Sequence, residues 1–207
     1  MVHSSIAQKI LMSLTGLVLF GFVIGHLAGN LPLLTGDAET YNKYSHFLIS
    51  LGALLILVEL ILLGCLAVHV WAAINLVRGK RKARPQRYHV TKRAGGASRK
   101  TLGSSTMIYT GLIILIFIVG HLRTFKYGPA EDAGFVVEVE GQQIRDMHRL
   151  VVETFQDPVY VVWYVVAMIV LGLHLSHAFW SAFQSLGFHH EKYTQVLYRG
   201  GRVLAFL

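Results

Sequence analysis

Four long apolar segments dominate the chain. They cover about residues 8–31, 46–77, 104–125 and 158–187, and few charged side chains interrupt them. A helix needs about 20 mostly apolar residues to cross the hydrocarbon of a bilayer. Each segment reaches that length, and a segment in lipid must satisfy its own backbone hydrogen bonds as a helix. The pattern therefore predicts an all-α membrane protein built on a bundle of four transmembrane helices.

A fifth apolar stretch begins near Tyr193 and runs to Leu207. It is too short to cross a membrane, so we expect residues 193–207 to be the start of a fifth transmembrane helix that is incomplete in this chain. We expect residues 1–207 to form a single integral-membrane domain.

The charges are distributed unevenly around the spans. Hydrophobic residues make up 54% of the chain and charged residues only 14%, which excludes an ordinary soluble domain. The segment 78–103 holds ten Lys or Arg and no Asp or Glu, whereas 126–157 is mainly acidic. Basic loops face the cytoplasm, so the N-terminus is predicted inside, in a multi-pass protein of the inner (cytoplasmic) membrane. We interpret the basic segment as an orientation signal and a docking surface for a cytoplasmic partner, in contact with membrane lipids and not with nucleic acid.

Every predicted span carries a histidine. Ionisable side chains inside a membrane are costly and usually face the bundle interior, where function resides. A single one would more simply be a hydrogen-bonded packing residue, but one in each of four spans indicates a shared role. The histidines are His26, His69, His121 and the pair His174 and His177.

The depths of these histidines fall into two levels. With a helix rise of about 1.5 Å per residue, His26 and His121 lie about 26 Å from the cytoplasmic ends of their spans. His69 lies about 12 Å deep, and His174 and His177 lie about 20 and 15 Å deep. The two levels draw on alternate helices. Two stacked pairs of imidazoles in a four-helix bundle are what two b-type haems require, because each iron takes two axial ligands.

Two other interpretations of these histidines compete with haem binding. A structural zinc site gathers its ligands within a few ångströms, and two separate levels argue against a single tetrahedral site. A histidine-bearing proton or metal transporter usually shows inverted repeats and helices broken by Gly or Pro. Here no Pro interrupts a span, and "GHL" recurs in spans of parallel direction. Glycines Gly21, Gly25 and Gly29 form a stripe beside His26 that gives room for a macrocycle or simply packs helices closely.

Several motifs carry a family resemblance. The strings "SSIAQKILMSLTGLVLFGFVIGHLAGN", "YHVTKR", "FQDPVYVVWYVV" and "GLHLSHAFWSAFQSLG" together cover most of the chain. With them the chain resembles the di-haem cytochrome b membrane-anchor subunit of succinate:quinone oxidoreductases, the succinate dehydrogenase and fumarate reductase family. The last string is the most specific of the four.

The resemblance implies ligands, cofactors and partners. His26 and His121 would bind the iron of the outer haem, and His69 and His174 that of the inner haem; helix depth alone prefers His177 to His174. The chain would pass electrons from a cytoplasmic iron–sulfur subunit through two haem b groups to a quinone, with menaquinone expected. Succinate chemistry and FAD would belong to a flavoprotein partner. The alternative is a di-haem cytochrome b of another quinone-linked dehydrogenase.

Five further residues are candidates near the outer haem. We hypothesise that Tyr44 and His46 belong to an outer quinone site, with interfacial anchoring as the alternative. Glu59 is the only carboxylate within a span; it would relay protons there or simply bond a backbone carbonyl. Arg123 and Lys126 could pair with haem propionates, although such residues usually serve as snorkelling anchors at a helix end.

Overall fold

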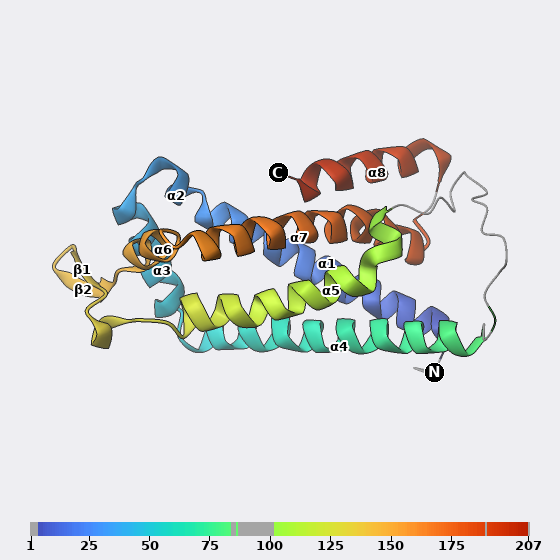
Figure 1. Ribbon diagram of the computed structural model, residues 1–207, viewed down its shortest axis with the longest axis horizontal. Coiled ribbons are helices and arrows are strands. Elements are labelled where there is room, and N and C mark those ends of the chain that lie inside the picture. The colour runs from blue at the N-terminus through green and yellow to red at the C-terminus, as the bar shows by residue number, and fades with distance from the viewer. Residues whose placement is uncertain (1–3, 84–85, 87–101, 189, 207) are drawn as a thin grey trace. The chain divides into compact units, whose positions relative to one another are not determined.

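Four long helices form the main part of the structure. A computed structural model describes residues 4–83, 86, 102–188 and 190–206 of the chain (Figure 1). The long helices are α1 (Ser5–Asn30), α4 (Ala53–Ala83), α5 (Leu102–His121) and α7 (Pro158–Ser185). All four are long and apolar enough to cross a membrane. The predicted helical membrane protein is confirmed at this level.

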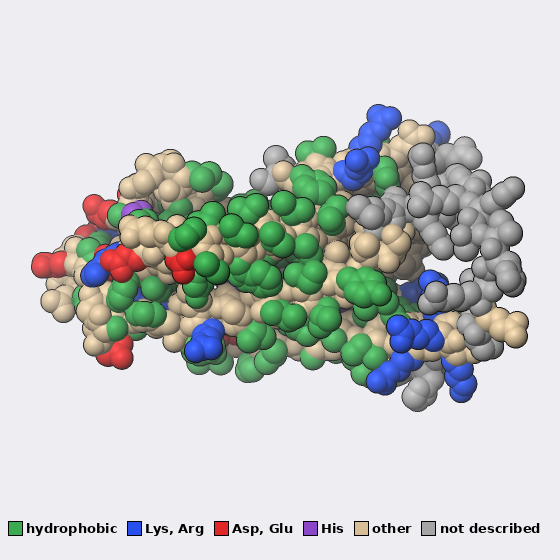
Figure 2. All heavy atoms as spheres, viewed as in Figure 1, with side chains coloured by type: hydrophobic (Ala, Val, Ile, Leu, Met, Phe, Trp, Pro, Cys, Tyr) green, Lys and Arg blue, Asp and Glu red, His purple; other side chains and the backbone are tan. Residues whose placement is uncertain are grey.

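The surface of the long helices is apolar. Large side chains such as Leu60, Leu63, Ile116 and Val162 are more than half exposed, and Figure 2 shows hydrophobic side chains along the helices. In water such a surface would be a severe liability, whereas lipid tails are as apolar as the side chains themselves. The helices are therefore suited to a lipid environment.

The second span begins later than the sequence indicated. Residues 38–50 form a separate helix, α3 (Ala38–Ser50), which starts where the Asp37 carboxylate accepts a hydrogen bond from the Thr40 amide at 2.9 Å. Gly52 then turns the chain with a φ of +54°, a conformation that favours glycine, before α4 starts at Ala53. The apolar residues before Gly52 hid this break. The predicted span over 46–77 is thus wrong at its start, and α4 also continues beyond the predicted end.

The third span ends in a wider helical turn. After α5, residues Leu122–Lys126 form the π-helix η2, closed by a hydrogen bond from the Tyr127 amide to the Leu122 carbonyl at 3.0 Å. Gly128 follows, and a Cβ there would collide with the Thr124 carbonyl oxygen. Isolated π turns are rare and often occur at functional sites. This one begins directly after His121.

The fourth span has clear start and stop signals. The Asp157 carboxylate accepts a hydrogen bond from the Val159 amide at 2.8 Å, and Pro158 occupies the first helical position of α7. Beyond the helix, Gly187 adopts a φ of +90°. Both ends agree with the predicted span over 158–187 to within two residues.

A helix follows at the predicted start of a fifth span. This helix, α8 (Glu191–Ala205), packs antiparallel along α7: Tyr198 contacts Trp180, with ring centroids 6.0 Å apart, and Gly201 lies against Phe179. Figure 1 shows α8 running back beside α7. Its 15 residues are fewer than the roughly 20 of a spanning helix. Membrane crossing by this segment stays a prediction.

The acidic segment forms a small cap that the sequence analysis did not predict. It contains the short helix η3 (Glu131–Ala133), strands β1 (Val136–Val139) and β2 (Gln142–Arg145), and α6 (Met147–Thr154). The antiparallel strands are joined by Glu140 and Gly141, both with positive φ as in a type I′ turn. The cap and α3 bury Tyr41, Val139, Ile144 and Leu150. Within the described residues, the fold is therefore all-α except for one hairpin.

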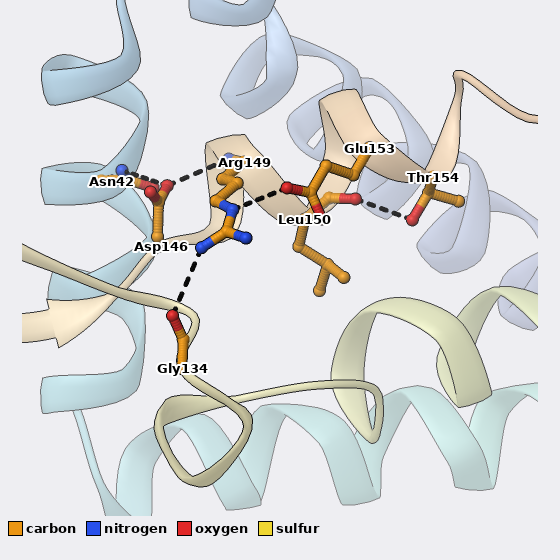
Figure 3. A network of polar contacts seen from close by, with 7 residues as sticks. All are labelled: Asn42, Gly134, Asp146, Arg149, Leu150, Glu153 and Thr154. Carbon is orange, nitrogen blue, oxygen red and sulfur yellow. Dashed lines mark hydrogen bonds and ion pairs between the residues drawn. The ribbon is translucent and has the colours of Figure 1, made fainter.

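A polar network joins this cap to α3 (Figure 3). Asn42, only 2% exposed, donates to the Asp146 carboxylate at 2.9 Å and accepts from the His148 amide at 2.9 Å. Asp146 also accepts from the amide of Arg149, whose guanidinium donates to Glu153 at 2.6 Å. At the edge of the cap, the Lys43 ammonium bonds Glu140 at 2.7 Å and thereby lowers the pKa of that carboxyl.

The chain divides into two compact units, and the division cuts through the long helices. Unit 1 comprises residues 1–20, 62–112 and 169–207, and unit 2 comprises 21–61 and 113–168. The short helix α2 (Pro32–Thr35), α3 and the cap belong to unit 2. In unit 1, basic side chains gather at the last turn of α4, over Lys80, Arg81 and Lys82 (Figure 2). Residues 87–101 of the predicted basic loop lie outside the described residues.

Candidate functional site

Unit 2 brings together the two histidines expected at the outer level. The imidazole centroids of His26, on α1, and His121, the last residue of α5, lie 5.6 Å apart, and the rings are nearly perpendicular at 88°. The His26 ring also stacks on Phe22 at 5.6 Å within the same helix. Two residues far apart in the sequence thus present imidazoles to each other.

The His121 ring is held by its surroundings. Its Nδ1 atom lies 3.1 Å from the hydroxyl of Tyr164 on α7. Phe117 and Phe125 flank the ring at centroid distances of 5.6 and 5.4 Å. Within the described part of the chain, Nε2 of His121 has no hydrogen-bond partner. That nitrogen is the atom left to coordinate a metal.

Unit 1 holds His69 and His174 in a similar way. The Nδ1 atom of His69 lies 3.1 Å from the carbonyl oxygen of Met12 and 3.4 Å from the Thr15 hydroxyl. The Nδ1 atom of His174 lies 3.0 Å from the Thr110 hydroxyl. A metal-bound histidine usually engages its second ring nitrogen in such a bond.

The neighbouring His177 has different surroundings. Its Nδ1 atom is buried and has no hydrogen-bond partner among the described residues. Its ring meets Trp180 edge-on at 5.9 Å, and its Cβ lies against Gly103. Of the two histidines on this turn of α7, His174 has the Nδ1 contact typical of a ligand. Its assignment to the inner site stays a prediction.

The long helices bury only small or polar side chains. In unit 1 these are Gln8, Ser13, Ala72, Thr110 and Ala182, and in unit 2 the long helices contribute only Ala167 within the described residues. A typical four-helix bundle fills its centre with large apolar side chains at crystal-like density. The buried apolar residues of unit 2 other than Ala167 lie in α3 and the cap. Among the described residues, the long helices therefore bury no large apolar side chain.

The glycines near the histidines do not act alike. A Cβ added at Gly21 or Gly25 would meet no atom within 4 Å, which agrees with open space beside His26. At Gly29, however, a Cβ would lie only 2.6 Å from Cε1 of Tyr44, so this glycine admits the tyrosine ring. The expected stripe thus has two roles. Gly21 and Gly25 leave room, and Gly29 allows close packing of α3 on α1.

The donor set fits a bis-histidine haem. With a metal–nitrogen bond of about 2 Å, two imidazoles on opposite sides of one iron place their centroids roughly 6 Å apart. His26 and His121 are separated by 5.6 Å, and open space adjoins Gly21 and Gly25. No group of three or more His, Cys, Asp or Glu that could hold a metal occurs in the described residues. The described residues of unit 2 thus offer one pair of imidazoles, His26 and His121.

The charged candidates of unit 2 separate into two kinds. Glu59 of α4 forms an ion pair with Lys126 at the end of η2. Because α4 begins at Ala53, Glu59 lies about 9 Å inside the helix start, shallower within its span than the sequence indicated. Lys126 therefore already has a carboxylate partner. Arg123 makes no ion pair or hydrogen bond among the described residues and remains the better candidate for a propionate.

The two quinone candidates on α3 also differ. Tyr44 is 37% exposed and packs its ring against Gly29, three residues after His26 in α1. His46 is half-buried and forms no hydrogen bond with the described residues. Among the described residues, neither forms a hydrogen bond or a ring contact with His26 or His121. A quinone role for them stays a hypothesis.

A cavity at the C-terminal end of α5 contains residues that the sequence analysis missed. It has a volume of 820 Å³ and is lined among others by Arg123, Glu153, Asp157 and Tyr160. The Tyr160 hydroxyl lies 3.1 Å from the Thr124 hydroxyl of η2. The acidic residues come from a segment whose acidic net charge was the feature noted in the sequence.

Sequence and structure comparisons add no relative. No protein-family model, no curated protein and no solved structure matches the chain.

Proposed function

We propose that this chain is a di-haem cytochrome b that anchors a succinate:quinone oxidoreductase in the inner membrane. The observation that carries the proposal is the approach of His26 and His121 to 5.6 Å between ring centroids, from different apolar helices. The Nδ1 contacts of His69 and His174 in unit 1 support a second site of the same kind. The motif strings support the family assignment.

In this proposal, Nε2 atoms of four histidines hold two haem b groups. His26 and His121 hold the outer group and His69 and His174 the inner one, with Arg123 as a counter-ion for a propionate of the outer group. A haem with both axial positions filled by histidine supplies one-electron transfer and leaves no iron site for oxygen or substrate. The chain itself contributes orientation, burial and hydrogen bonds.

The chemistry at the ends of the electron path belongs to other groups. A cytoplasmic iron–sulfur subunit would supply electrons from the FAD of a flavoprotein that oxidises succinate, and a quinone, with menaquinone expected, would accept them. The basic segment that begins in the last turn of α4 supports a cytoplasmic docking surface and an inside N-terminus. The alternative partner is another quinone-linked dehydrogenase.

Histidine variants test the haem assignment. His69→Ala or His174→Ala should remove one haem, and His26→Ala or His121→Ala the other, each leaving about half of the absorbance of the reduced α band. His46→Ala is the matched control, because it changes a histidine of unit 2 outside both pairs. Retention of the full haem content by the His26 and His121 variants would refute the outer site.

The partner assignment needs a separate experiment. The tagged chain should co-purify with a flavin-containing subunit that reduces a quinone when succinate is added. Co-purification with a different dehydrogenase, with haem present, would support the alternative and exclude the succinate enzyme.

A further inference from the structure

Three of the four paired histidines bond through Nδ1 to a neighbouring helix. Met12 and Thr15 of α1 contact His69 of α4, and Thr110 of α5 contacts His174 of α7. Tyr164 of α7 contacts His121 of α5. These contacts go beyond the pairing of the imidazoles, because they bear on where each ring carries its proton.

The hydrogen-bond partners of Nδ1 determine the tautomer of His69. The Met12 carbonyl oxygen can only accept, so Nδ1 of His69 must carry the hydrogen at 3.1 Å. The Thr15 hydroxyl donates its own hydrogen to the Leu11 carbonyl at 2.7 Å and is therefore an acceptor toward the ring. With Nδ1 protonated, a neutral imidazole keeps its lone pair on Nε2.

The Thr110 hydroxyl determines the tautomer of His174. The Thr110 hydroxyl donates its single hydrogen to its own helix: its oxygen lies 3.1 Å from the Met107 carbonyl oxygen and 3.2 Å from the Thr106 carbonyl oxygen. Thr110 therefore accepts from Nδ1 of His174 at 3.0 Å, and Nε2 again carries the lone pair. Thr110 is buried, with 5% exposure, so water does not replace it readily.

The supporting hydroxyls have a regular place in the sequence. Thr15 and Thr110 stand eleven residues before the histidines of their own helices, and Tyr164 stands ten before. Three turns of an α-helix contain about 11 residues, so each hydroxyl lies near the helix face that carries the histidine. In α5, for example, His121 is the proposed ligand of one site, and Thr110 bonds His174 of α7 at the other site.

We propose that Thr110 and Tyr164 are positioning residues, each of which bonds Nδ1 of one haem-ligating histidine and thereby orients its Nε2 atom for metal binding. When Nε2 of His121 binds a metal, Nδ1 carries the hydrogen and the Tyr164 hydroxyl accepts it. Thr110 acts on His174 of the inner site and Tyr164 on His121 of the outer site. This inference rests on the proposed function. An acceptor at Nδ1 makes the imidazole a stronger donor and favours ferric iron, so its loss should raise the reduction potential.

Two variants test the proposal through haem potentials and not through turnover. Thr110→Val should shift the one-electron reduction equilibrium of the haem at His69 and His174 about tenfold toward the ferrous form, which converts to about 59 mV. Tyr164→Phe should shift the other haem by a similar factor. Each variant is the control for the other, and the electron paramagnetic resonance signal of the affected ferric haem should also change.

Conservative variants separate the hydrogen bond from packing. Thr110→Ser retains the hydroxyl and should restore the wild-type potential. Tyr160→Phe removes a neighbouring phenol of α7 that bonds Thr124 and should shift neither haem. Two haems with unchanged potentials in both Thr110→Val and Tyr164→Phe would overturn this inference alone. An unmutated chain that binds no haem would overturn the proposed function itself.

Discussion

Asn42 joins α3 to the cap, and its removal should loosen the cap without unfolding the long helices. The side chain is buried, donates to the Asp146 carboxylate and accepts from the His148 amide, each at 2.9 Å. Asn42→Ala removes a bond to a charged group and leaves the part-buried His148 amide without its acceptor. Hydrogen bonds to charged groups contribute roughly 1.5–3 kcal/mol, and an unsatisfied buried donor costs about 1–3 kcal/mol.

The combined effect should be about 3 kcal/mol, because the two terms overlap. At about 1.4 kcal/mol per factor of ten, this corresponds to roughly 150-fold faster amide exchange in β2 and α6. Hydrogen exchange with mass spectrometry in detergent micelles measures that rate directly. Asn75→Ala is the matched control: among the described residues, the Asn75 side-chain amide donates only to the Trp71 carbonyl of its own helix, at 3.0 Å, so its removal should leave the exchange of the cap unchanged. Exchange of the Asn42→Ala cap within about threefold of wild type would refute the reasoning.

Three further predictions concern unit 2. Glu59→Gln and Lys126→Met should each destabilise the protein in detergent titration, whereas the double variant should lose about 1 kcal/mol less than their sum; additive effects would show that the ion pair does not couple α4 to η2. Gly29→Ala should speed amide hydrogen exchange in α3 by displacing the Tyr44 ring, and the double variant with Tyr44→Ala should not show this additional effect of the alanine. An unaltered exchange rate in Gly29→Ala alone would contradict the close packing of Tyr44 on Gly29. The lowered pKa of Glu140 means that its ion pair with α3 contributes stability above the ordinary value of 4.5 and loses it as the pH falls below that value. Carboxyl NMR should therefore show Glu140 titrating below 4.5, and a midpoint at or above 4.5 would contradict the ion pair.

The sequence predicted the spans because lipid imposes a simple rule on them. A run of about 20 apolar residues has few alternatives to a helix in a bilayer, so α1, α5 and α7 were found to within a few residues. Counting apolar residues could not locate the break at Gly52, because apolar side chains stand on both sides of it. The positive φ of that glycine is a property of the folded chain.

The cap was missed although its signals are local. Alternating apolar and polar residues around Glu140 and Gly141 are typical of a hairpin with a two-residue turn. The sequence analysis interpreted the segment from its acidic charge alone. The π turn at Leu122–Lys126 has no comparable sequence signal. It depends on the hydrogen bond from the Tyr127 amide to the Leu122 carbonyl, which forms in the folded chain and has no signature in the sequence.

For the candidate site, the histidines were predictable and their partners were not. A histidine in a span stands out because it is costly there. Threonines such as Thr110 are common in membrane helices, and the sequence does not show that its hydroxyl lies within hydrogen-bonding distance of His174. The spacing of ten or eleven residues between hydroxyl and histidine was a usable signal that the sequence analysis did not use. The Glu59–Lys126 pair likewise needed the position of η2 to become visible.

The ratio of haem to protein chain tests the central claim most directly. The chain is expressed with haem synthesis intact, purified in mild detergent, and assayed for protohaem by its pyridine adduct against quantitative amino-acid analysis. The account predicts about two protohaems per chain, both low-spin in the ferric state. A colourless, folded chain that retains its helical circular dichroism spectrum and takes up no haem on reconstitution would contradict it.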